Sequence, residues 1–256
     1  MRGAALSAIL VLICGCAAVP GIAVTPRYGP SEADGDIAIS SIGMLVRSSV
    51  DQMGVEQDDS VFSPRIDIDW GPVDITLTTF DALYEGSGTA EAQLDLGGVV
   101  ISAGDRVDSK LDLFLFFSAV TWDFVPGDTF CAGLGLGYGI VDFKADIKSL
   151  STGDSIGSAE TFGIPLLVAR AGVSTGRLDV SLLLSGLAAR ADGDEVALLD
   201  ADLFARYELV SHGVVAGALS LGYRYIMVDA EYNTLGSGVD ADLDFQGPYF
   251  GLTLEL

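Results

Sequence analysis

The sequence has little positive charge and a single histidine. Its 256 residues include 13 lysines and arginines against 36 aspartates and glutamates, which gives a net charge of -23. Proteins bind nucleic acids largely by neutralising phosphates with lysine and arginine. Because no basic patch interrupts this acidic chain, we expect no nucleic-acid partner.

Cysteine is also scarce, and no long hydrophobic run follows the N-terminal one. Beyond the first 16 residues the only cysteine is Cys131, so no disulfide framework can form there. A reactive thiol needs a cation or a histidine nearby, whereas Cys131 lies among glycine and alanine; we interpret it as structural. A transmembrane helix needs about 20 successive apolar residues, and no later segment provides them.

The N-terminus has the organisation of a secretory signal, with Arg2 followed by the apolar run AALSAILVLICGCAA. Within it, Ile13-Cys14-Gly15-Cys16 resembles a lipobox, the signal of bacterial lipoproteins. This resemblance implies a signal peptide over residues 1–16 and a lipid anchor at Cys16.

A second interpretation of the signal stays open. Gly21-Ile22-Ala23 is a possible site for ordinary signal peptidase, which would make residues 1–23 the signal peptide. Residues 17–36 are rich in proline, glycine and acidic residues and predict a flexible tether. The folded domain is then expected over residues 37–256.

What the chain has in abundance is apolar residues and glycine, at 50% and 32 residues. Segments of β type follow one another without a helical period. We predict ten strands, at 37–48, 63–71, 73–86, 106–124, 129–147, 159–173, 177–190, 198–209, 214–231 and 239–256.

The connections between these strands alternate strictly between short and long. Tight turns at 71–72, 125–128, 174–176 and 210–213 alternate with longer, mostly acidic loops. Short turns on one side and long loops on the other are typical of outer-membrane barrels with an even strand count. The fold class that we predict is all-β, an antiparallel up-and-down transmembrane β-barrel.

Period-two alternation supports a two-faced wall in several strands. In RIDIDW, for example, Ile66, Ile68 and Trp70 oppose Asp67 and Asp69. Two segments, 111–120 and 164–173, are instead apolar on both faces. They indicate either a partly apolar lumen or the buried core of a soluble protein.

Both tryptophans lie beside short turns. Trp70 precedes the turn at 71–72, and Trp122 precedes the turn at 125–128. Tryptophan is enriched where a membrane meets water, so we expect both to belong to an interfacial aromatic belt.

The last strand resembles the insertion signal of bacterial outer-membrane barrels, a polar-x-Gly-x-x-apolar-x-apolar pattern. Tyr249, Gly251, Leu254 and Leu256 occupy its positions, with leucine in place of the usual terminal aromatic. The resemblance covers roughly residues 37–256. It implies a small barrel in the bacterial outer membrane, with membrane lipid, lipopolysaccharide and the barrel-assembly machinery as partners.

Catalytic chemistry finds little support in the sequence, and we predict no enzyme. His212 stands in a short turn beside Ser211, where neighbouring side chains point to opposite sides and no aspartate is placed to orient the ring. Barrel proteases of omptin type combine paired aspartates with an Asp–His couple, and here no histidine accompanies the loop acids.

Acidic residues raise one possible cofactor. Asp240, Asp242 and Asp244 alternate near the outer end of the last strand, and oxygen-rich clusters can hold Ca²⁺. Phe245 stands where an EF-hand loop requires glycine, so solvated acids are the competing interpretation, and we expect no cofactor.

Three arginines lie within strands that have few other cations: Arg170, Arg206 and Arg224. A buried charge is costly unless it is paired, so we expect them to pair with acids on the lumen face. The candidate acids are Asp67, Asp69, Asp202 and Glu208.

The sequence favours a non-enzymatic barrel of structural or surface-interaction type with a narrow, ion-paired lumen. One alternative is a narrow channel or a conduit for an apolar ligand. Another is a soluble periplasmic lipoprotein barrel that binds a small apolar ligand.

Overall fold

The computed structural model describes residues 20–41, 44–49, 58–89, 94–96, 99–125, 127, 129–191, 194–234 and 237–256. All regular structure in these ranges is β-strand. No helix among these residues is long and apolar enough to cross a membrane.

Fifteen strand segments make up the described chain. In order they are β1 (Gly21–Thr25), β2 (Arg27–Ser41), β3 (Met44–Ser49), β4 (Asp58–Phe62), β5 (Arg65–Trp70), β6 (Val73–Thr89), β7 (Leu94–Leu96), β8 (Val99–Ile101), β9 (Arg106–Val125), β10 (Phe130–Ser149), β11 (Ser155–Thr175), β12 (Leu178–Ala191), β13 (Asp194–His212), β14 (Val215–Thr234) and β15 (Ser237–Glu255).

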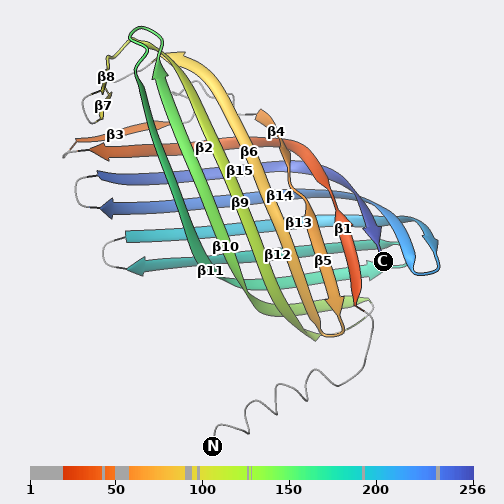
Figure 1. The fold of residues 1–256 in the computed structure, drawn as a ribbon. Helices are drawn as coiled ribbons and strands as arrows, with labels where there is room; N and C mark the ends of the chain where they lie inside the picture. Colours follow the sequence, from red (N-terminus) through yellow and green to blue (C-terminus); the bar gives the residue numbers. More distant parts are fainter. Residues whose placement is uncertain are drawn as a thin grey trace, which may run out of the picture.

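Thirteen of these segments form one sheet that closes into an antiparallel barrel of ten strands, as predicted, while β7 and β8 pair with each other in a separate sheet. Figure 1 shows the arrangement. Segments β1 and β2 together form the first strand, and β3, β4 and β5 contribute the second. The last strand, β15, pairs with both β1 and β2. At the chain end, Leu256 and Ile22 exchange two backbone hydrogen bonds of 2.9 and 3.1 Å, so the final residue completes the closure.

The N-terminal boundary differs from the prediction. Residues 21–36 lie in β1 and β2 rather than in a flexible tether, and the predicted strand 37–48 contains the end of β2 and most of β3. Pro30 fits a strand because the β2–β15 register skips from Glu32↔Gln246 to Tyr28↔Phe250. The ladder therefore does not need a hydrogen bond from proline at that point.

Two glycines permit this irregularity. A Cβ atom on Gly29 would lie 2.1 Å from the carbonyl oxygen of Pro248, and one on Gly247 would lie 2.1 Å from that of Pro30. The two backbones thus approach more closely than any side chain allows. The glycines and proline that predict a flexible tether are instead the residues that allow this close backbone contact.

Three of the four predicted short turns overlap their expected positions, although Val210 to His212 belong to β13; residues 126 and 128 of the fourth lie outside the described residues. Gly71, Gly176 and Gly213 occupy these three turns with φ angles of 65°, 64° and 66°, a left-handed conformation that glycine adopts without strain. The β7–β8 hairpin was not predicted; it lies within the long connection between β6 and β9.

Above the short-turn half, the barrel wall separates into two groups of strands. In Figure 1, β6, β9, β10 and β11 run towards the upper left, while β12 to β15 and β2 run to the left behind them. On one side the β11–β12 ladder ends at Leu167↔Gly186. On the other, the pairing of β4 with β6 consists of Phe62↔Asp81. The long-loop half is therefore a flattened barrel.

The space between these two groups is filled by an apolar core. Leu111, Leu113, Leu115 and Phe117 of β9 are buried there, with Phe245 and further side chains of β14 and β15 opposite. The two doubly apolar segments thus have one face in this core. Their other face is exposed, for example at Phe114 and Leu167, so these segments are not buried on both faces and the lumen beside them is partly apolar.

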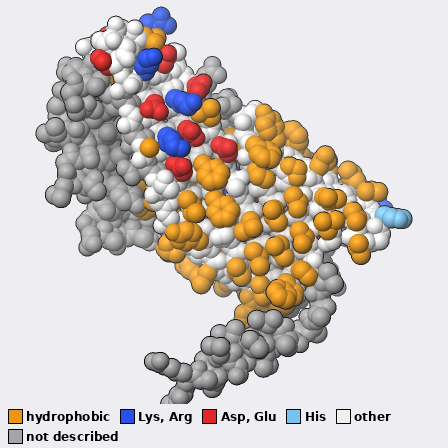
Figure 2. All heavy atoms as spheres, viewed as in Figure 1, with side chains coloured by type: hydrophobic (Ala, Val, Ile, Leu, Met, Phe, Trp, Pro, Cys, Tyr) orange, Lys and Arg blue, Asp and Glu red, His pale blue; other side chains and the backbone are white. Residues whose placement is uncertain are grey.

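The outer surface has two zones (Figure 2). Towards the short turns it is covered by exposed apolar side chains such as Leu136, Leu221, Phe250 and Leu252. Towards the long loops, lysine and acidic side chains replace them. In the long-loop half, the outer surface is thus charged and the interior beneath it is apolar.

Candidate functional site

Beneath the apolar zone, the barrel interior holds a buried polar cluster built around three arginines. Arg27, at the start of β2, is 1% exposed. Its guanidinium donates to the Asp202 carboxylate at 2.6 Å, to the Ser63 carbonyl at 2.6 Å and to the Thr78 hydroxyl at 2.6 Å. Every side of this charge is therefore occupied by an oxygen.

Arg65, the first residue of β5, lies beside it. Its guanidinium is 2.8 Å from the Asp67 carboxylate and 3.1 Å from that of Asp202. The ring of Phe204 lies 4.2 Å below the guanidinium carbon, a cation–π contact. Asp67 also accepts a hydrogen bond of 2.8 Å from the Thr76 hydroxyl.

Arg224 of β14 completes the group. It forms a bidentate pair with Asp200, with both N···O distances at 2.9 Å. It also donates to the Ser63 hydroxyl at 2.8 Å and to the Thr79 carbonyl at 3.0 Å. The planar guanidinium suits such two-pronged contacts, and both charges are almost fully desolvated.

Tyr249 of β15 joins this cluster from the closing strand. Its hydroxyl donates a hydrogen bond to Asp202, and the Arg27 guanidinium lies 4.6 Å from its ring centroid. The ring crosses the face of Gly222, where a Cβ atom would come within 2.3 Å of it. The cluster thus ties the strand that closes the barrel to β2 and β13.

Charge in the cluster is balanced, since Arg27, Arg65 and Arg224 face Asp67, Asp200 and Asp202. Buried charges persist only when they are paired and hydrogen-bonded, and these are. A cavity beside Arg224, Phe80 and Tyr249 has a volume of about 20 Å³, which holds roughly one water. The arrangement leaves no room there for a substrate.

A second set of interior ion pairs lies nearer the short turns. Arg170 pairs with Asp74 and lies 4.0 Å from Asp69. Arg206 pairs with Asp179 at 3.2 Å and with Glu255 at 3.0 Å. These groups are partly exposed, so each pair contributes less to stability than the buried ones.

Of the three arginines expected to pair with Asp67, Asp69, Asp202 or Glu208, Arg170 lies 4.0 Å from Asp69. Arg224 pairs with Asp200 instead, and Asp202 pairs with Arg27 and Arg65. Asp67 binds Arg65, and Arg206 pairs with Asp179 and Glu255 rather than with Glu208.

Sequence reasoning missed two of the buried arginines. Arg27 falls in the segment read as a tether. Arg65 shares its face with Asp67 and Asp69 in RIDIDW, so the period-two pattern already contained the signal for its inward position.

Comparison with solved structures agrees with this architecture. The outer-membrane protease OmpT of Escherichia coli superposes with a TM-score of 0.55 at 9% identity, covering 92% of this chain and 97% of that one. The fold is that of the bacterial outer-membrane β-barrels.

Two further structures with this type of fold match with lower scores. The translocator domain of NalP from Neisseria meningitidis has a TM-score of 0.39 at 13% identity, covering 99% of this chain and 94% of that one. The attachment invasion locus protein Ail of Yersinia pestis has 0.28 at 10%, covering 88% and 98%. No protein-family model matches the chain, and no curated protein matches it.

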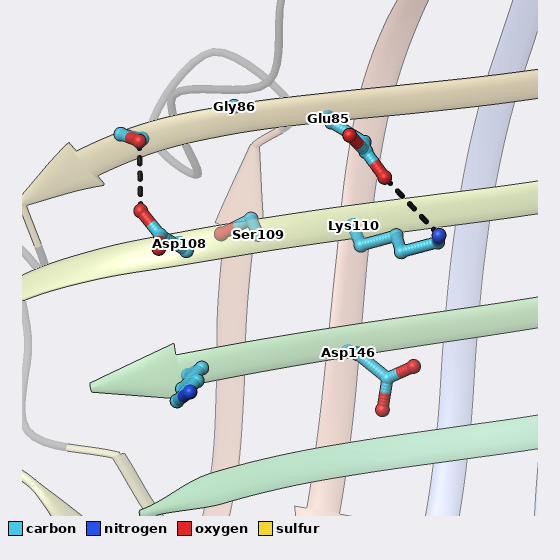
Figure 3. A pocket seen from close by; sticks show the side chains of 8 residues that line it. Glu85, Gly86, Asp108, Ser109, Lys110 and Asp146 are labelled. Carbon is cyan, nitrogen blue, oxygen red and sulfur yellow. Dashed lines mark hydrogen bonds and ion pairs between the residues drawn. The ribbon is translucent and has the colours of Figure 1, made fainter. Parts of the chain in front are cut away.

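On the outer surface of the barrel, a charged hollow of about 680 Å³ lies on β6, β9 and β10 near the long loops (Figure 3). Lys110 pairs with Glu85 at 3.1 Å, and Ser87 donates to Asp108 at 2.8 Å. Asp146 and Lys148 from β10 also line it. Side chains of both signs, all exposed, thus face solvent together.

Two of the three candidate calcium ligands, Asp242 and Asp244, lie on the outward face of the barrel. They alternate with the buried Leu243, and the Tyr225 hydroxyl donates to Asp244 at 2.7 Å. The side chain of Asp240 lies outside the described residues. Within the described residues, no group of three or more histidines, cysteines or acids could hold a metal ion.

The residues of the predicted insertion signal divide between the two faces. Tyr249 and Gly251 face the interior, whereas Leu254 and Leu256 are exposed on the outer face. Trp70 and Trp122 are also exposed, and both have Val73 as a register partner next to the turn at Gly71. His212 lies at the short-turn end (Figure 2), far from the charged hollow.

Proposed function

We propose that this protein is an outer-membrane barrel of structural and surface-interaction type, without enzymatic activity. The observation that carries the proposal is that the interior is filled with side chains while the outer end of the barrel is charged. The polar cluster and the apolar core occupy successive levels of the lumen, and polar side chains for contacts outside the cell remain on the outer surface.

Residence in the membrane is supported by the apolar zone. Soluble monomers rarely expose large continuous apolar patches, whereas a membrane barrel needs a lipid-facing apolar band with aromatic residues at its edges. Leu136, Leu221, Phe250 and Leu252 supply such a band, and Trp70 and Trp122 lie at its short-turn edge.

A structural role also fits the position of the histidine and of the acids. His212 is exposed at the short-turn end, and in the outer hollow Glu85 and Asp108 are engaged with Lys110 and Ser87. The described residues that line the hollow include no histidine or cysteine, so a histidine-activated nucleophile is not assembled there. The interacting partner that we propose for the outer hollow is lipopolysaccharide. Lys110 and Lys148 would contact its phosphates directly, and the acids would contact its bound divalent cations.

Two measurements test this function. In isolated outer membranes, the unboiled protein should migrate differently from the boiled protein, because a closed barrel resists SDS until it is heated. In planar bilayers it should produce no steady ion conductance. Release by alkaline carbonate with no mobility shift would support the soluble lipoprotein instead, and reproducible single-channel steps would support the channel.

The lipid anchor at Cys16 is part of the proposal. Ala23 pairs with Glu255 on one side and with Asp67 on the other, so cleavage after Ala23 would cut through β1. Cleavage before Cys16 would leave this strand whole. Insertion by the barrel-assembly machinery is supported by the position of the closing strand, which ends at Leu256 beside β1.

A further inference from the structure

One of the two places where the described wall of the barrel opens is the seam between β11 and β12. Their ladder runs from Thr175↔Leu178 to Leu167↔Gly186 and stops there. Strand β11 nevertheless stays bonded to β10 up to Ser155, and β12 stays bonded to β13 up to Ala191. Both strands are thus intact above Leu167 and Gly186, and it is their mutual pairing that ends.

An apolar groove of about 420 Å³ occupies this seam. Its sides are the outward side chains of Leu167 and Leu184 together with Leu199 and Met227. Its floor contains Ala188 and Ala197, which are register partners on β12 and β13. Among the side chains that the structure describes, no charged one lines it, so a charged ligand would lose hydration there without compensation.

The groove borders the interior of the barrel. Val168 and Leu198 line it, and both are core residues with 3% and 2% exposure. The same groove therefore touches the outward leucines of the apolar zone and the buried side chains of the interior. A space of this size lies within the range of about 300–1,000 Å³ found for small-molecule sites.

We propose that this groove binds the hydrocarbon chain of a neighbouring membrane lipid, which passes between β11 and β12 and contacts the apolar core. The groove is continuous with the outer apolar surface through Leu134, Leu167 and Leu184, so a lipid can enter it without crossing water. This proposal rests on the membrane location proposed above.

Lipid photolabelling tests it in the full-length protein. The barrel is reconstituted in vesicles of phosphatidylethanolamine and phosphatidylglycerol that contain a trace of phosphatidylethanolamine with a diazirine in its acyl chain. After irradiation, adducts are located by peptide mass spectrometry. We expect adducts at Val168 or Leu198, and none at Leu183, which is equally buried but does not line the groove.

A matched pair of variants gives the control. Ala188→Trp fills the groove from its floor, and Val180→Trp adds the same bulk on the outward face of β12 within the intact ladder. The inward adducts should be lost in A188W and kept in V180W, while both variants retain the heat-dependent mobility shift.

Three outcomes would overturn the proposal in different ways. Adducts confined to outward residues such as Leu136 in every variant would show a barrel in the membrane with a closed seam. Inward labelling by a free diazirine fatty acid, but not by the vesicle lipid, would assign the groove to a soluble apolar molecule. No adducts anywhere would contradict the membrane location itself.

Discussion

The ring of Tyr249 lies directly over Gly222, and this contact sets the path by which the tyrosine hydroxyl reaches Asp202. The two residues are register partners on β15 and β14. The residue without a side chain makes room for the one that links the closing strand to the buried arginines.

Gly222→Ala should therefore destabilise the barrel. The new Cβ atom would lie 2.3 Å from Tyr249 and 2.8 Å from the Leu203 carbonyl oxygen, so the ring must leave Asp202. Losing a partner for a buried charged group costs about 1–3 kcal/mol or more. The measurement is the temperature at which the unboiled gel form is lost. Gly217→Ala on the same strand is the control, because its Cβ atom would meet only Val210 at 3.4 Å; equal shifts in both variants would contradict the prediction.

Tyr249→Phe should separate folding stability from membrane assembly. It keeps the aromatic ring beside Arg27 and removes only the hydrogen bond to Asp202, at a cost of about 1.5–3 kcal/mol. We expect a lower urea midpoint in detergent micelles, with an unchanged amount of protein in the outer membrane. Tyr249→Ala should lower both quantities. A phenylalanine variant with wild-type stability would mean that the hydroxyl has no structural role.

Arg224→Met should be more costly than the removal of both members of its ion pair. The single change leaves Asp200 buried without its bidentate partner, and such a loss costs about 3–5 kcal/mol. In the double variant Arg224→Met with Asp200→Leu, most of this stability should return. Urea unfolding followed by the fluorescence of Trp70 and Trp122 measures both. If the double variant were as unstable as the single one, the loss of stability would not come from leaving Asp200 unpaired.

Replacing the two lysines of the outer hollow should leave the free energy of unfolding almost unchanged and should test whether the hollow binds lipopolysaccharide. Glu85 and Lys110 are 63% and 47% exposed, and exposed pairs contribute about 0–1 kcal/mol. Lys110→Glu with Lys148→Glu should weaken lipopolysaccharide binding measured by co-sedimentation, at an unchanged urea midpoint. Arg177→Glu with Arg206→Glu, at the opposite end of the barrel, changes the net charge by the same amount and serves as the control. Equal binding by all three proteins would remove the hollow from the proposed function.

Cys16→Ser should abolish incorporation of radiolabelled palmitate and slow removal of the signal peptide. The intact mass of the purified wild type should correspond to a chain that starts at Cys16 with added acyl groups. A chain that starts after Ala23 would contradict the anchor, and it would also lack half of β1.

The number of strands and their alternating faces could be predicted because both follow from short-range pattern. An inward polar residue followed by an outward leucine, as in Asp202 and Leu203, marks a two-faced wall wherever it recurs. The first strand could not be found in this way, since Gly29, Pro30 and Gly35 have turn-forming propensities. Only the contact with Gly247 and Pro248, more than 200 positions later, explains their place in a strand.

The partners of the interior arginines were beyond sequence reasoning for a related reason. Arg27 and Asp202 are 175 residues apart, and whether they meet depends on the register of every strand between them. A shift by two residues would keep each side chain on its face and still change every ion pair. The pattern thus predicts which residues point inward but not which of them touch.

The inversion of polarity along the barrel has a consequence for its vertical position. If the protein moved outward by one pair of residues, leucines and phenylalanines of the apolar zone would enter water. If it moved inward, Lys110, Lys144 and Asp142 would enter hydrocarbon. Both displacements cost free energy, so the level at which outward leucine gives way to outward charge fixes the depth of the protein in the bilayer.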